Sequence, residues 1–101
     1  MPKQQKPQLD KFAIAAALQE IAALMELKGG PYRFKAKAYN AGARSIQAVE
    51  NLDQLVAQDR LTSLPRIGDA LASQIRQLYL TGESSVLKDL KEEFPVGTAE
   101  L

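Results

Sequence analysis

A proline and a glycine three residues apart, Pro65 and Gly68, constrain the fold of this chain more than any other feature. Because Pro65 fixes its own φ and disfavours the α region for Leu64, a helix approaching from the amino-terminal side ends there. Gly68 allows the backbone to turn sharply or to approach another group closely, and Asp69 follows in a position to cap a second helix. The apolar face of that helix repeats at the helical period, with Leu71, Ile75 and Leu78. The segment therefore predicts two helices joined by a tight turn.

The tight turn also predicts a place for an anion. The first N–H groups of a helix have no partner within the helix, and the helix dipole favours a negative charge there. We therefore expect the backbone at Ile67 and Gly68 to bind a phosphate group, with the guanidinium of Arg66 beside it. The alternative is an ordinary corner between two helices.

The composition indicates a single globular domain. With 101 residues, 46% of them hydrophobic and 25% charged, the chain is long enough for one modest core. It contains neither cysteine nor histidine, which excludes disulfides, the usual zinc sites and catalysis by those two side chains. Lysine and glutamate interrupt each apolar run, so we expect no membrane span. We expect a monomer that is intracellular, in the bacterial cytoplasm and nucleoid, and that requires no cofactor.

The order of apolar, capping and breaking residues predicts an all-α fold, a compact bundle of four main helices plus a short one. We expect a disordered arm over residues 1–9, a helical domain over 10–95, and a tail or the start of a further domain over 96–101. The first three main helices are expected over about 11–28, 32–49 and 70–81, and the short one over 51–58. The fourth main helix follows a cap at Ser84 or Ser85 and runs to Phe94, where Pro95 stops it. Asp10 caps the first of these helices.

Apolar spacing assigns a buried side to each of the first two helices. The first helix repeats apolar residues at i, i+4, i+7 and i+11, with Ile14, Leu18, Ile21 and Met25. For the second helix we expect the buried side to contain Phe34, Ala38, Ala41 and Ala48.

Positive charge is concentrated in the second helix. Between residues 27 and 49 there are five cationic residues and no acidic one, although the net charge of the whole chain is only +1. Three of the cations, Arg33, Lys37 and Arg44, fall on one stripe, while Lys35 and Tyr39 lie four residues apart on another edge. Such a stripe suits contact with phosphates, and a solvated surface helix is the alternative.

The turn resembles the helix-hairpin-helix motif, in which a leucine and a proline precede a Gly-hydrophobic-Gly turn. Leu64, Pro65, Ile67 and Gly68 match this pattern, and Arg66 replaces the first glycine. Over residues 9–101 the chain further resembles the amino-terminal domain of family X DNA polymerases, the DNA polymerase beta family. Three blocks carry that resemblance in order: FKAKAY at 34–39 with the apolar residues that follow it, the hairpin at 64–75, and residues 78–82.

The resemblance implies binding to the 5′-phosphate side of a DNA gap in repair or replication. It implies that Lys35 and Tyr39 contact that phosphate, and that the carbonyls of Thr62, Leu64 and Ile67 hold a monovalent cation, K⁺ or Na⁺. It also places the family's Schiff-base lysine at Gln74, whose amide cannot form a Schiff base.

The resemblance places two supporting lysines of the family at Ala70 and Val86, which carry no charge. The sequence has no strand with a pair of metal-binding aspartates, which nucleotidyl transfer requires. We therefore expect residues 10–95 to form a helix-hairpin-helix DNA-binding domain that is not an enzyme by itself and that is either free-standing or part of a longer family X DNA polymerase. The alternatives are a 5′-deoxyribose-phosphate lyase that uses Lys35 or Lys37, and a helical protein-interaction module.

Overall fold

The computed structural model describes residues 9–93, and over this range every regular element is helical. The helices are α1 (Lys11–Lys28), α2 (Tyr32–Ala48), α3 (Leu52–Ala57), the 3₁₀ helix η1 (Leu61–Ser63), α4 (Asp69–Thr81) and α5 (Ser85–Glu93). The prediction of an all-α bundle with four main helices and one short helix is confirmed. Most of the predicted arm, the stop at Pro95 and the tail at 96–101 lie outside the described residues.

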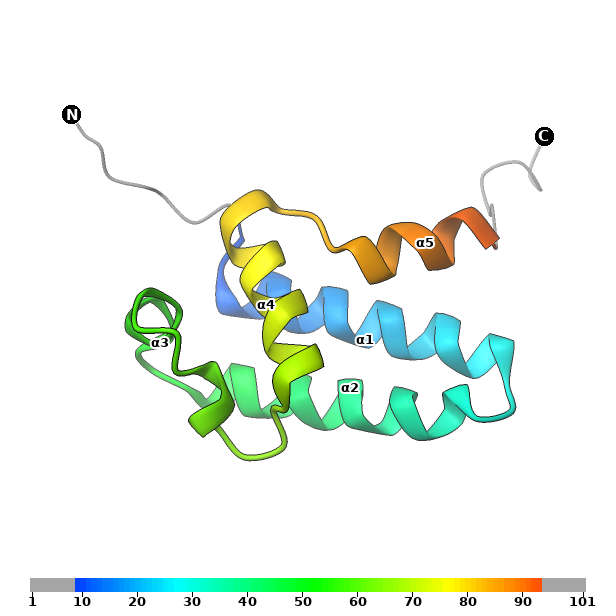
Figure 1. Ribbon diagram of the computed structural model, residues 1–101, viewed down its shortest axis with the longest axis horizontal. Helices are drawn as coiled ribbons and strands as arrows, with labels where there is room; N and C mark the ends of the chain where they lie inside the picture. Colours follow the sequence, from blue (N-terminus) through cyan, green and yellow to red (C-terminus); the bar gives the residue numbers. More distant parts are fainter. Residues whose placement is uncertain (1–8, 94–101) are drawn as a thin grey trace.

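Helix α1 is the centre of the arrangement (Figure 1). It contacts α2, α4 and α5. Helix α2 lies along one side of α1 and α5 along the other, while α4 crosses the α1–α2 pair and α3 lies at one end (Figure 1). Asp10 caps α1 as predicted, because its Oδ1 accepts a hydrogen bond from the Ala13 N–H at 2.8 Å.

The predicted core stripe of α1 is confirmed. Ile14, Leu18 and Ile21 are fully buried, and Met25 is almost so. Alanines on the same helix, such as Ala15 and Ala22, are also buried and bring the neighbouring helices close to α1.

The predicted buried side of α2 is wrong. Phe34 is 75% exposed, Ala38 and Ala48 are exposed, and Ala41 is half-buried. The core face of α2 instead carries Ala36, Tyr39, Gly42, Ala43 and Ile46. Apolar residues lie on both faces of this helix, so the larger residue Phe34 suggested the wrong one.

Gly42 allows the hairpin to pack against α2. A Cβ atom at this position would overlap the Leu71 side chain of α4 and would lie 3.4 Å from Cδ1 of Ile67. Both of those side chains are buried. The missing side chain therefore lets the turn and the start of α4 lie directly on α2.

The end of α4 and the start of α5 lie at the predicted glycine and serine. Gly82 ends α4 in the left-handed region with φ 82°, and Ser84 caps α5 by accepting a hydrogen bond from the Leu87 N–H at 3.2 Å. The Ser84 hydroxyl in turn donates to Oε1 of Gln74 at 2.5 Å. Both side chains of this last pair are buried.

Candidate nucleic-acid interface

The turn between η1 and α4 has the backbone that its proline dictates. Leu64 is extended, with φ −79° and ψ 145°, and Pro65 follows it. Helix α4 begins one residue earlier than predicted, because the Gly68 carbonyl already accepts a hydrogen bond from the Ala72 N–H at 2.9 Å. Gly68 is therefore the N-cap, with no side-chain cap, and Asp69 is the first helical residue rather than the cap.

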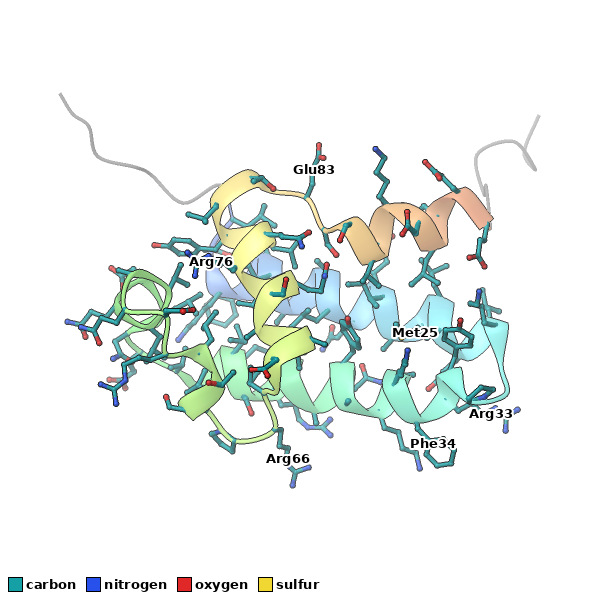
Figure 2. The ribbon with its side chains drawn as sticks, in the orientation of Figure 1. Met25, Arg33, Phe34, Arg66, Arg76 and Glu83 are labelled. Carbon is teal, nitrogen blue, oxygen red and sulfur yellow. The ribbon has the colours of Figure 1, made fainter. Side chains whose placement is uncertain are left out.

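Arg66 takes the left-handed backbone conformation, with φ 67°. This is the position at which the motif has its first glycine, and a side chain there costs about 1–2 kcal/mol. The guanidinium of Arg66 projects from the turn away from the bundle (Figure 2). Within the described residues it forms no ion pair.

The backbone conformation at position 68 does not require a glycine. Its φ of −92° and ψ of −174° describe an extended residue that any amino acid adopts. A Cβ atom built on it would meet no atom within 4 Å. Of the two roles predicted for Gly68, the sharp turn does not require it, whereas the open space around it allows another group to approach closely.

A hollow of about 710 Å³ lies between the turn and the carboxyl-terminal half of α2. We call it the hairpin groove, and its walls are formed by Arg44, Ser45 and Ala48 of α2 and by Leu64, Pro65 and Arg66 of the turn. The Ser45 hydroxyl donates a hydrogen bond to the Pro65 carbonyl at 2.8 Å and so ties the two walls together. The structure thus brings together two of the predicted phosphate-binding residues, Arg44 and Arg66.

Ser45 and Gly42 position the turn, and neither role was predicted from the sequence. Gly42 could have been recognised, because a glycine inside a helical pattern indicates close packing. No comparable signal marks Ser45, because its partner is a backbone carbonyl 20 residues away.

The other predicted phosphate contacts lie toward the amino-terminal end of α2. Arg33, Lys35 and Lys37 are all exposed there, and Figure 2 shows Arg33 and Phe34 far from Arg66 along the helix. Arg33 and Arg44 are 11 residues apart, which corresponds to about 16 Å along the helix axis. The cations of α2 therefore form two groups, one at the hairpin groove and one at this end.

Lys35 and Tyr39 do not form an exposed pair. Tyr39 is only 7% exposed, and burial raises the pKa of its hydroxyl. Nζ of Lys35 instead lies 5.4 Å from the centre of the Tyr32 ring, a cation–π contact. The structure places Tyr39 in the core, and phosphate contact by its hydroxyl stays a prediction.

The three carbonyls predicted to hold a monovalent cation belong to η1 and the turn. Thr62 lies in η1 and is exposed, and Ile67 is buried with its side chain in the core. The Leu64 carbonyl accepts a hydrogen bond from the Ile67 N–H at 3.3 Å and keeps its second lone pair. Backbone oxygens of this kind suit K⁺ or Na⁺. In the described range no group of three acidic, histidine or cysteine side chains could hold a metal ion.

Gln74, where the sequence resemblance placed the Schiff-base lysine, makes structural contacts. Its Oε1 accepts hydrogen bonds from the Ser84 hydroxyl and, at 3.4 Å, from the Val86 N–H. The amide thus joins α4 to the start of α5. Ala70 is exposed and Val86 is half-buried.

These features define an all-α domain whose hairpin presents a helix N-terminus and an arginine to solvent. A family model described as "Helix-hairpin-helix domain" matches residues 10–84, and the chain belongs to this family. No curated protein and no solved structure matches the chain significantly. Over residues 9–93, no helix combines the length and apolar character needed to cross a membrane.

Proposed function

We propose that this chain is a DNA-binding domain that recognises the phosphate backbone without reading sequence. The observation that carries the proposal is the uncapped start of α4, whose N-cap is Gly68 with no side-chain cap. A Cβ atom built on Gly68 would meet nothing within 4 Å, so a ligand can approach the backbone closely there. The N–H groups at the uncapped start of α4 suit a phosphate in that place.

The DNA that fits best is a gap with a 5′-phosphate, as in the family X amino-terminal domains that the sequence resembles. Phe34 supports this choice, because it is 75% exposed and lies between Arg33 and Lys35. An exposed aromatic ring among cations suits an unpaired base, which stacks on it while the cations contact neighbouring phosphates. Lys35 supplies the charge for the terminal phosphate in this proposal.

We propose a role in DNA repair or replication inside the cell, with the domain binding as a monomer. A K⁺ or Na⁺ ion on the carbonyls of Thr62, Leu64 and Ile67 would add positive charge beside the bound phosphate. We further propose that the chain has no lyase activity. Gln74 cannot act as the amine nucleophile, and Lys35 and Lys37 lie on an exposed helix surface rather than in a desolvated pocket that would activate a lysine.

Fluorescence anisotropy with gapped duplexes tests the binding proposal. We expect affinity to fall steeply as salt rises, to be insensitive to sequence, and to be higher for the 5′-phosphate than for the 5′-hydroxyl duplex. Arg66→Glu should weaken binding strongly while the circular dichroism spectrum stays unchanged. Absence of salt-dependent binding would instead favour a protein-interaction module.

Borohydride trapping on DNA with a 5′-deoxyribose phosphate tests the lyase proposal. We expect no efficient covalent adduct from the wild-type domain. An adduct that maps to Lys35 or Lys37 would show that another lysine performs the reaction.

A further inference from the structure

Two arginines line the hairpin groove. Arg44 lies on its α2 wall and Arg66 on its turn wall. Among the described residues neither forms an ion pair, although three other ion pairs are present. Two like charges around one hollow leave a place for an anion between them.

The backbone of Arg66 supports the same conclusion. Its φ of 67° is unfavourable for any residue with a side chain, and glycine would remove the strain. The Arg66 side chain forms no hydrogen bond or ion pair in the described part of the chain that would offset this strain. An uncompensated strained residue at an exposed turn is a sign of function rather than of folding.

The two walls are held at a fixed separation. The Ser45 side chain, next to Arg44, donates to the carbonyl of Pro65, next to Arg66, at 2.8 Å. One hydrogen bond therefore links the neighbours of both arginines. Glu50 also lines the groove, and its carboxylate repels an anion, so a bound phosphate would lie on the side of the arginines.

Building on the proposed function, we propose that Arg44 and Arg66 together bind one backbone phosphate of the nucleic acid in the hairpin groove. This phosphate is separate from the one at the N-terminus of α4. Arginine suits the role because its planar guanidinium donates two parallel hydrogen bonds to phosphate oxygens. The site therefore adds a second, adjacent contact on the DNA backbone to the one that the turn makes.

Salt dependence of binding tests whether the two arginines share a phosphate. The slope of log affinity against log salt changes by about 0.9 for each phosphate that the protein neutralises in duplex DNA. We would measure the slope for wild type, Arg44→Gln, Arg66→Gln and the double variant on one 5′-phosphorylated gapped duplex. If the two side chains share a phosphate, the double variant loses about 0.9 in slope, against about 1.8 for two phosphates. Its loss of affinity is then smaller than the product of the two single losses.

The pair Arg33→Gln and Arg66→Gln is the matched control. Arg33 lies at the amino-terminal end of α2, whereas Arg66 lies in the turn beside its carboxyl-terminal end. Their losses of affinity should therefore multiply, and the slope should fall by about 1.8. The same slope change for the Arg44 and Arg66 double variant would overturn the shared site, while salt-dependent wild-type binding would leave the proposed function intact. If wild type does not bind the duplex at all, both proposals fail. Circular dichroism and a thermal melt confirm that each variant is folded.

Discussion

The two ends of α2 present positive charge in different ways. At the carboxyl-terminal end, Arg44 faces a groove whose opposite wall is fixed by the hydrogen bond from Ser45 to Pro65. At the amino-terminal end, Arg33, Lys35 and Lys37 are exposed around Phe34. The first arrangement suits one phosphate in a defined position, and the second suits a flexible strand with unpaired bases. The two ends differ because the hairpin turn lies against only the carboxyl-terminal end of α2.

The largest effect should come from breaking the contact between α2 and the hairpin. Gly42→Val would place a branched side chain against Leu71, and overpacking of this kind costs about 1–3 kcal/mol of folding free energy. Urea denaturation measures the loss. Ala38→Val, at an exposed position of the same helix, is the control and should change stability by less than about 1 kcal/mol. Equal losses would mean that the hairpin does not rest on Gly42.

Removing the exposed Phe34 ring should weaken only the DNA contact at the amino-terminal end of α2. Phe34→Ala should lower affinity for a gapped duplex by about 1–2 kcal/mol, because a base loses its stacking surface. Anisotropy on gapped and fully paired duplexes measures the difference, which should be confined to the gapped one. Phe12→Ala is the matched control, since Phe12 is 60% exposed on α1. A similar loss for Phe12→Ala would remove the special role of Phe34.

The same substitution at the two arginines of the groove should change stability in opposite directions. Arg66→Gly should raise the free energy of unfolding by about 1 kcal/mol, because glycine adopts the left-handed conformation without strain. Arg44→Gly should lower it by about 1 kcal/mol, because glycine is unfavourable inside a helix. Thermal melts of the two variants provide the comparison. Destabilisation by Arg66→Gly would show that the arginine side chain supports the fold.

The smallest effect concerns Tyr39 at alkaline pH. Burial raises its pKa in the folded protein above the ordinary value of 10.0. As pH rises through about 10, the unfolded chain loses this proton first, so stability is fully present below that pH and falls above it. Tyr39→Phe should make the fall shallower in urea titrations between pH 9 and 11. An unchanged pH dependence would mean that Tyr39 is more accessible to water than its burial indicates.

Much of the fold follows from local signals in the sequence. The cap at Asp10, the stripe of α1 and the stop at Leu64 depend on neighbouring residues and were predicted correctly. The buried face of α2 was predicted wrongly, because alanines occur around the whole helix and its sides differ little in hydrophobicity. Tertiary packing decides between them, and Gly42 permits the contact that buries one face.

The sequence predicted individual residues of the candidate site but not which of them lie together. Sequence spacing placed Arg33 and Arg44 on one stripe, yet the groove pairs Arg44 with Arg66, which lies 22 residues further along the chain. That pairing depends on the bond between Ser45 and a backbone carbonyl, which no residue pattern encodes. The left-handed conformation of Arg66 likewise follows from the turn as a whole, and the sequence showed only that a glycine was missing.

The hydrogen bond between Ser45 and Pro65 also has a consequence for the rate of binding. Because this bond links the two walls of the groove in the free protein, the proposed docking of DNA would need no rearrangement of the turn. Encounter would then be governed by diffusion under the attraction of the arginines, and electrostatic steering raises association rates by a factor on the order of 10–10³. Salt should therefore slow the arrival of DNA at this site, whereas loss of the Ser45 hydroxyl should slow the productive docking that follows encounter.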